Sequence, residues 1–157
     1  MKRFLTFLLT GILAFCLAGC QELDQVLDQV SQQAGDQVEY GQVYRSDEEV
    51  SAYLNAYQEL PPNYITKKQA QAAGWESDKG NLWEVTDKKT IGGDHFGNFE
   101  KKLPADETYR EADVNYYGGY RGDDRLVYSS SGDIYYTDDH YQSFKQLYWG
   151  EDNEWKK

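Results

Sequence analysis

Residues 109–141 read YREADVNYYGGYRGDDRLVYSSSGDIYYTDDHY, and this stretch decides the fold class. Short segments rich in Tyr, Val and Ile alternate with polar residues, which is the period of a half-buried β-strand. Pairs of turn-forming residues separate these segments: Gly118-Gly119, Ser131-Gly132 and Asp138-Asp139. Because such pairs favour tight turns, the sequence predicts a meander of antiparallel strands from Tyr109 onward.

The chain before this stretch carries helix signals instead. Capping-box pairs open two helices: Ser46 with Glu49, and Thr66 with Gln69. The first helix is expected to end at Pro61-Pro62-Asn63 and the second at Gly74, and a short third helix is expected near Asn81. Helices first and strands second predict an α+β domain, with N-terminal helices packed on a C-terminal antiparallel β-sheet.

Length and composition limit the class of protein further. The 157 residues allow one ordinary domain. Aromatic residues make up 15% of the chain, which a disordered acidic protein would not carry. The formal net charge of −11 argues against a protein that coats nucleic acid by bulk charge, although it leaves room for a local basic site.

The N-terminus has the pattern of an export signal. Lys2 and Arg3 precede an apolar run that is too short and wrongly flanked for a membrane span. The run ends in Leu17-Ala18-Gly19-Cys20, which resembles the lipobox of bacterial lipoproteins, so lipidation of Cys20 is expected. The alternative is an ordinary signal peptide with cleavage nearby. Either interpretation predicts an extracytoplasmic protein, secreted or anchored to the membrane through a lipidated Cys20.

These signals divide the chain into four parts. Residues 1–19 are interpreted as the signal peptide, and residues 20–45 as a polar, Gln-rich tether. Residues 46–148 form the globular domain, and residues 149–157 form a C-terminal tail. Cys16 and Cys20 are the only cysteines, so the mature chain keeps at most one and forms no internal disulfide. The fold must therefore rest on its hydrophobic core.

The residues that could perform chemistry are few. The chain lacks CxxC, HExxH, P-loop and GxSxG patterns, and its two histidines are too few for most His-built metal sites. Neither a metal nor a cofactor is therefore expected. The strand region nevertheless holds a carboxylate, an imidazole and guanidinium groups: Glu111, His140, Arg110, Arg121 and Arg125. Such a set can bind a phosphodiester and move protons on it, but a surface ion pair and a capping His explain the spacing equally well.

A resemblance decides between these interpretations. Collinear segments from about Ser46 to Tyr148 resemble the barnase/binase-type family of microbial guanyl-specific ribonucleases. The matching segments are Leu60-Pro61-Pro62-Asn63-Tyr64-Ile65-Thr66-Lys67, Lys79-Gly80-Asn81-Leu82, Ile91-Gly92-Gly93-Asp94, Arg110-Glu111-Ala112-Asp113, Tyr120-Arg121, Asp124-Arg125, Tyr128-Ser129-Ser130 and Asp139-His140-Tyr141-Gln142. The resemblance implies a barnase-like fold and a metal-independent endoribonuclease. Its reaction would be transesterification of single-stranded RNA to a 2′,3′-cyclic phosphate.

The resemblance also implies catalytic roles. Glu111 would be the general base that takes the proton of the ribose 2′-hydroxyl, and His140 would be the general acid that protonates the leaving 5′-oxygen. Lys67, Arg121 and Arg125 would hold and stabilise the phosphate. Asp113 would orient the two arginines.

Guanine recognition is implied for one loop and one aromatic residue. The loop consists of Phe96, Gly97, Asn98, Phe99 and Glu100. Its backbone N–H groups would meet guanine O6, and the Glu100 carboxylate would accept bonds from guanine N1 and N2. Tyr141 would offer a surface on which a base stacks, whereas the structural alternative for Phe96 and Tyr141 is core packing.

Three departures from the family bear on affinity and rate rather than on reaction type. Phe99 stands where the family has an arginine that touches the phosphate. The stretch Ala105-Asp106-Glu107 is shorter and more acidic, and the whole chain is acidic where the family is basic.

The alternative function is that of a non-catalytic extracytoplasmic lipoprotein that uses this fold as a binding module. Such a protein would not need Glu111, Arg121, Arg125 and His140 together. The partners implied by the resemblance are single-stranded RNA and a barstar-like inhibitor protein. The enzyme itself is expected to be a monomer.

Overall fold

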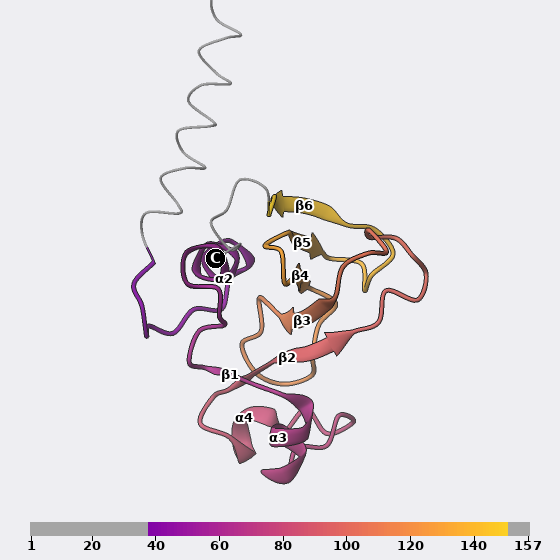
Figure 1. The fold of residues 1–157 in the computed structure, drawn as a ribbon. Coiled ribbons are helices and arrows are strands. Elements are labelled where there is room, and N and C mark those ends of the chain that lie inside the picture. The colour runs from indigo at the N-terminus through magenta and orange to yellow at the C-terminus, as the bar shows by residue number, and fades with distance from the viewer. Residues whose placement is uncertain (1–37, 151–157) are drawn as a thin grey trace, which may run out of the picture. The chain divides into compact units, whose positions relative to one another are not determined.

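The structure is a computed structural model, and it describes residues 38–150. The expected signal peptide, Cys20, most of the tether and residues 151–157 lie outside the described residues. No helix within residues 38–150 is long and apolar enough to cross a membrane. Within these described residues, three helices and six strands follow one another (Figure 1). They are α2 (Asp47–Tyr57), β1 (Tyr64–Ile65), α3 (Lys67–Ala72), α4 (Leu82–Val85), β2 (Thr90–Phe96), β3 (Tyr109–Asp113), β4 (Arg125–Ser129), β5 (Ile134–Thr137) and β6 (Lys145–Tyr148).

The strands form one sheet in the order in which they occur along the chain, β1 to β6. Strand β1 pairs with β2 in parallel, and all other neighbours are antiparallel. The predicted α+β class and the predicted meander are confirmed. The predicted turn pairs lie in the loops that join β3 to β4, β4 to β5 and β5 to β6.

Both predicted capping boxes are present. In α2, the Ser46 hydroxyl accepts a bond from the Glu49 N–H, and the Glu49 carboxylate accepts one from the Ser46 N–H. Thr66 and Gln69 make the same reciprocal pair at α3. Helix α2 ends before its predicted proline stop, because Gln58 adopts a left-handed conformation (φ 60°) and donates its N–H to the Leu54 carbonyl.

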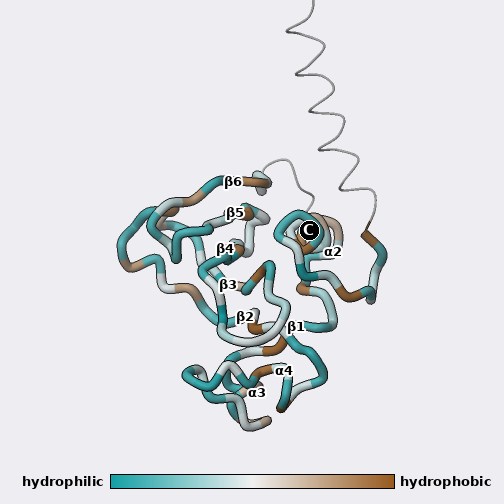
Figure 2. The backbone as a smooth tube through the Cα atoms, turned by 180° about the vertical axis from the view of Figure 1, so that it is seen from behind, coloured by the Kyte–Doolittle hydropathy of each residue, from teal (hydrophilic) through white to brown (hydrophobic). Residues whose placement is uncertain are grey.

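The two faces of the sheet are covered differently. Helix α2 packs on one face through Val50 and Leu54, which lie against Ala112, Leu126 and Ile134. The other face carries a second apolar cluster of buried residues: Leu103, Tyr109, Val127 and Tyr135. Helices α3 and α4 lie together at the β1 end of the sheet (Figure 1). Figure 2 shows hydrophobic positions within the labelled strands and mostly hydrophilic positions along the connecting loops.

Packing begins earlier in the chain than Ser46. Residues 38–45, which the sequence assigns to the tether, lie against α2. Tyr57 donates its hydroxyl to the Val38 carbonyl, and Tyr53 accepts a bond from the Gly41 N–H. Tyr40 stacks on Tyr53 with ring centroids 6.4 Å apart. These contacts make residues 38–45 an edge of the folded domain.

The sequence did not predict β1 and β2. Strand β2 reads TIGGDHF, so glycines and polar residues replace the alternation that marks the later strands. An ideal Cβ on Gly92 would lie 2.6 Å from the Tyr64 ring and 2.9 Å from the Ala112 Cβ. The glycine is therefore required for close packing against Tyr64 and Ala112, and this requirement removes the hydrophobic signal of the strand.

Replacing Gly92 by Ala should destabilise the fold by about 1–3 kcal/mol, because the added methyl group overpacks the core beside Tyr64 and Ala112. Urea unfolding monitored by circular dichroism measures the change. Gly122→Ala is the matched control, since a Cβ at that position meets nothing within 4 Å. Equal midpoints for the two variants would contradict this account of β2.

Candidate active site

Strand β3 divides its side chains between the two faces of the sheet. Ala112 packs toward α2, whereas Tyr109 lies in the cluster on the opposite face. Since side chains alternate along a strand, Glu111 and Asp113 share the face of Tyr109. Both carboxylates are buried, with side chains 10% and 3% exposed. Buried carboxylates require partners, and each of these has two.

Asp113 is bound by two arginines. Arg121 donates from Nε and Nη2 to the two Asp113 oxygens, at 2.6 and 2.7 Å. Arg125, which is paired with Asp113 in the β3–β4 register, places its Nε 2.9 Å from Asp113 Oδ1. Two guanidinium groups against one carboxylate leave a surplus positive charge, which suits the binding of an anion.

Glu111 is held in its charged form. Lys67 Nζ donates to Oε1 at 2.6 Å, and the Tyr141 hydroxyl donates to Oε2 at 2.5 Å. Burial alone would raise the pKa of Glu111, but the bonds from Lys67 and Tyr141 and the charges of Lys67 and Arg125 outweigh it. The pKa of Glu111 therefore lies below its usual value, and the group is an ionised base at neutral pH.

His140 lies on a turn that Asp139 organises. His140 is exposed and has a left-handed backbone conformation (φ 54°), as does Tyr141 (φ 70°). Asp139 accepts bonds from the Thr137 hydroxyl and from the N–H groups of Gln142 and Ser143. Hydrogen bonds from Ser143, the largest contribution, hold the pKa of Asp139 well below its usual value. The anionic Asp139 thus stabilises the turn that presents His140.

A pocket of about 360 Å³ brings the predicted groups together. Its lining includes Glu111, His140, Tyr141 and the whole of loop 96–100. Lys67, Arg121, Arg125 and Asp113 are not part of this lining. Lys67 contacts Glu111 directly, and the two arginines surround Asp113 on the neighbouring part of the sheet face.

Loop 96–100 is fixed by its own side chains. Asn98 has a left-handed conformation (φ 44°), donates to the Leu103 carbonyl and accepts the Leu103 N–H. The Asn98 side chain is therefore used within the loop. Phe96 stacks on Tyr141 with ring centroids 5.2 Å apart, so both aromatic residues pack together as well as line the pocket.

Phe99 does not pack into the core. It is 94% exposed, and its ring covers Gly97, where a Cβ would collide with it. Phe99 therefore does not anchor this loop to the protein interior.

Two residues that the sequence did not single out complete the site. Lys102 Nζ lies 2.7 Å from Glu100 Oε2 and also donates to the Tyr141 carbonyl, so it joins the two sides of the pocket. Asp94 accepts the Lys67 N–H at 2.8 Å and so fixes the start of α3 beside Glu111. The sequence feature that could have identified Lys102 as a site residue is its position two residues after Glu100. Within residues 38–150, no three His, Cys, Asp or Glu side chains gather as a metal site would require.

Comparison with known proteins identifies a family. A family model described as ribonuclease matches residues 47–148. A ribonuclease from Heyndrickxia coagulans is 55% identical over 100 residues, which are 62% of this chain and 92% of that protein. Ribonucleases from Bacillus intermedius and Bacillus pumilus are also 55% identical over 100 residues, and the match spans 62% of each of those chains.

Removal of the Tyr141 hydroxyl should raise the pKa of Glu111. The bond from Tyr141 favours the charged carboxylate, so Tyr141→Phe is expected to shift that pKa upward by about one unit, the equivalent of ~1.4 kcal/mol. NMR titration of the Glu111 carboxyl carbon measures the shift. Tyr136→Phe is the control, because its hydroxyl donates to Asp124 instead. An unchanged or lower pKa in Tyr141→Phe would show that the bond does not hold the charge.

Proposed function

Since this chain belongs to the ribonuclease family, we propose that it is a metal-independent endoribonuclease that cleaves single-stranded RNA after guanosine. The observation that carries the proposal is the shared pocket: one cavity is lined by Glu111, His140 and loop 96–100. A base, an acid and a recognition loop therefore face one substrate.

The first proposed step is a transesterification. Glu111, ionised at neutral pH, accepts the proton of the guanosine 2′-hydroxyl. The 2′-oxygen attacks the adjacent phosphorus, and the bond from phosphorus to the 5′-oxygen of the next nucleotide breaks. His140 supplies the proton to that leaving oxygen. The products are a 2′,3′-cyclic phosphate and a free 5′-hydroxyl.

The second proposed step is hydrolysis of the cyclic phosphate with the roles exchanged. His140, now neutral, takes a proton from water, and the water oxygen attacks the phosphorus. The bond from phosphorus to the 2′-oxygen breaks, Glu111 returns its proton to that oxygen, and the product is a 3′-phosphate. A substrate without a 2′-hydroxyl cannot take part in the first step, so DNA is not cleaved.

The positive groups stabilise the charge that develops on the phosphoryl oxygens. Arg121 and Arg125 are held rigidly by Asp113, so they need no reorganisation when that charge appears. Lys67 is bonded to Glu111 and faces the same reaction centre.

Guanine recognition is proposed for loop 96–100. The backbone N–H groups of the loop would donate to guanine O6, and Glu100 would accept from N1 and N2 after exchanging its contact with Lys102. Tyr141, whose ring lies on that of Phe96 and lines the pocket, would stack on an unpaired base.

Export is the proposed route to the substrate. The N-terminal segment with Leu17-Ala18-Gly19-Cys20 supports secretion or membrane attachment through a lipidated Cys20. A barstar-like inhibitor protein is a proposed partner, because a ribonuclease made in the cytoplasm endangers the RNA of its own cell.

Loss of either proton-transfer group should nearly abolish activity. Glu111→Gln and His140→Ala are each expected to lower kcat on guanosine-containing RNA by ~10²–10⁴-fold, the usual value of a positioned acid or base. Steady-state cleavage of a fluorogenic RNA measures kcat and KM.

The control for these variants is Lys145→Ala, which removes an exposed charged side chain on β6 that lines neither pocket. Wild-type activity should also persist in EDTA, because the proposed steps use only side chains. Full activity in Glu111→Gln or His140→Ala would contradict the roles proposed for these residues, whereas a folded wild-type protein that cleaves no RNA would favour the alternative of a non-catalytic binding module. A loss in EDTA would contradict the metal-independent mechanism.

Restoring a cation at the tip of the recognition loop should increase activity. Phe99→Arg is expected to raise kcat/KM on guanosine-containing RNA, because an added charge-assisted hydrogen bond to phosphate contributes ~1.5–3 kcal/mol. The effect should be largest at low salt, where screening is weakest, and guanine preference should survive. Phe99→Gln separates the gained charge from the lost ring. An unchanged or lower kcat/KM in folded Phe99→Arg would defeat this account.

A further inference from the structure

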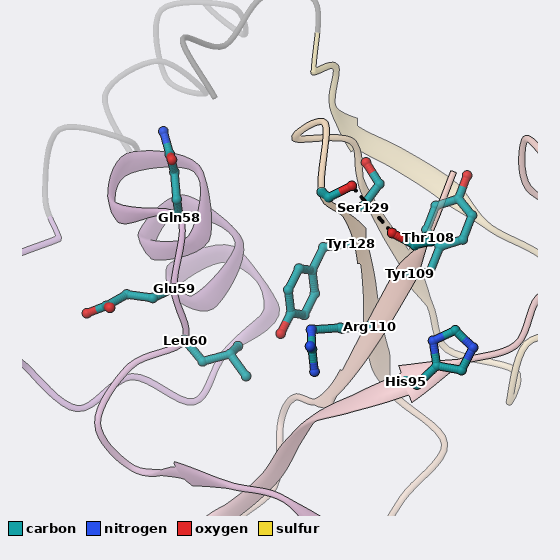
Figure 3. A pocket seen from close by; sticks show the side chains of 10 residues that line it. Gln58, Glu59, Leu60, His95, Thr108, Tyr109, Arg110, Tyr128 and Ser129 are labelled. Atoms are coloured by element: carbon teal, nitrogen blue, oxygen red, sulfur yellow. Dashed lines mark hydrogen bonds between the residues drawn. The ribbon is translucent and has the colours of Figure 1, made fainter. Parts of the chain in front are cut away.

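A second pocket, of about 520 Å³, lies between the end of α2 and the β2–β4 part of the sheet (Figure 3). Its lining includes Leu60, His95, Thr108, Arg110, Tyr128 and Ser130. His95 lines both this pocket and the pocket that holds Glu111 and His140. The two cavities therefore meet at the end of β2.

Arg110 gives this pocket a cation. It is exposed, and its Nη1 donates to the Gly93 carbonyl, which fixes the guanidinium beside β2. The acidic residue of the lining, Glu59, points away from Arg110 in Figure 3 and instead raises the pKa of Tyr40. Asp94 is the other nearby acid, and no carboxylate within residues 38–150 forms an ion pair with Arg110. The guanidinium therefore keeps N–H groups available to a phosphate group.

The rest of the lining suits a base and a sugar. Leu60 and Tyr128 lie near each other in Figure 3, and both line the pocket and provide apolar surface. Burial raises the pKa of Tyr128 to about 12, so its hydroxyl stays a hydrogen-bond donor at neutral pH. The exposed hydroxyls of Thr108 and Ser130 lie 3.4 Å apart at the rim. A volume of about 520 Å³ is in the range of pockets that hold small organic ligands.

The edge of the sheet leaves a path between the two pockets. Strand β1 pairs with β2 only at Thr90 and Ile91, so residues 92–96 have no strand on that side within the described chain. A nucleic acid strand can cross this edge beside His95. His140, which would protonate the leaving nucleotide on the 3′ side, lines only the first pocket of the two. The second pocket thus extends the guanine side of the site, away from the leaving group.

We propose that the second pocket binds the nucleotide on the 5′ side of the cleaved guanosine, with its phosphate at Arg110 and its base against the apolar surface of Leu60 and Tyr128. This inference rests on the proposed function and deepens it: the substrate is a longer RNA strand, and residues on both faces of the sheet contact it.

Three minimal substrates test the inference: GpA, ApGpA and GpApA. The wild-type protein should cleave ApGpA with a kcat/KM about tenfold above that for GpA, because a charge-assisted phosphate contact is added. Arg110→Gln should remove this gain and leave cleavage of GpA unchanged. Ser130→Trp, which fills the pocket without altering Arg110, should remove it too. Lys145→Gln, which removes an exposed charge on β6, should retain it.

The measured quantity is kcat/KM for ApGpA divided by kcat/KM for GpA. A substitution that slows the chemical step lowers both values equally, because GpA uses only the first pocket, so it leaves this ratio unchanged. A wild-type ratio near one, a ratio unchanged in Arg110→Gln, or a gain that appears with GpApA instead would overturn the inference. If the wild-type protein cleaves none of the three, the proposed function fails. Binding of the 2′-deoxyguanosine analogues of GpA and ApGpA then tests the second pocket separately, with the same Arg110 dependence expected.

Discussion

The site depends on the ion pairs that the buried Asp113 carboxylate forms with Arg121 and Arg125. Its side chain is 3% exposed, and Arg125 is almost equally buried. Removing one partner of such a group typically costs ~3–5 kcal/mol, because an unpaired charge then remains inside the protein. The three groups therefore stay together, and they concentrate positive charge in a chain with a net charge of −11, which suits the proposed binding of a phosphate.

Strand β3 transmits this constraint to the rest of the site. Glu111 lies two residues before Asp113, on the same face, so the register that buries Asp113 also places Glu111 beside Lys67 and Tyr141. Arg110 points to the other face, where the second pocket lies. One five-residue strand thus supplies the base of the proposed reaction, the anchor of its phosphate site and the cation of the proposed second nucleotide site.

Sequence reasoning predicted the features that local chemistry determines. The capping boxes at Ser46 and Thr66 and the turns of the meander depend on neighbouring residues, so their signals are short-range. Strand β2 was not predicted because Gly92 lacks the side chain that would mark a strand. The glycine is required for close packing against Tyr64 and Ala112, which are distant in sequence. The Tyr141 bond to Glu111 and the bridge made by Lys102 were missed for the same reason, since the partners meet only in the folded chain.

The proposed reaction is cleavage of RNA after guanosine through the 2′-oxygen. It can be tested by digestion of a short RNA that contains a single guanosine, followed by mass spectrometry of the products. We expect one cut, on the 3′ side of the guanosine, with a 2′,3′-cyclic phosphate as the first product and a 3′-phosphate after longer incubation. Cuts at other bases with equal rates, or a product that carries a 5′-phosphate, would contradict it.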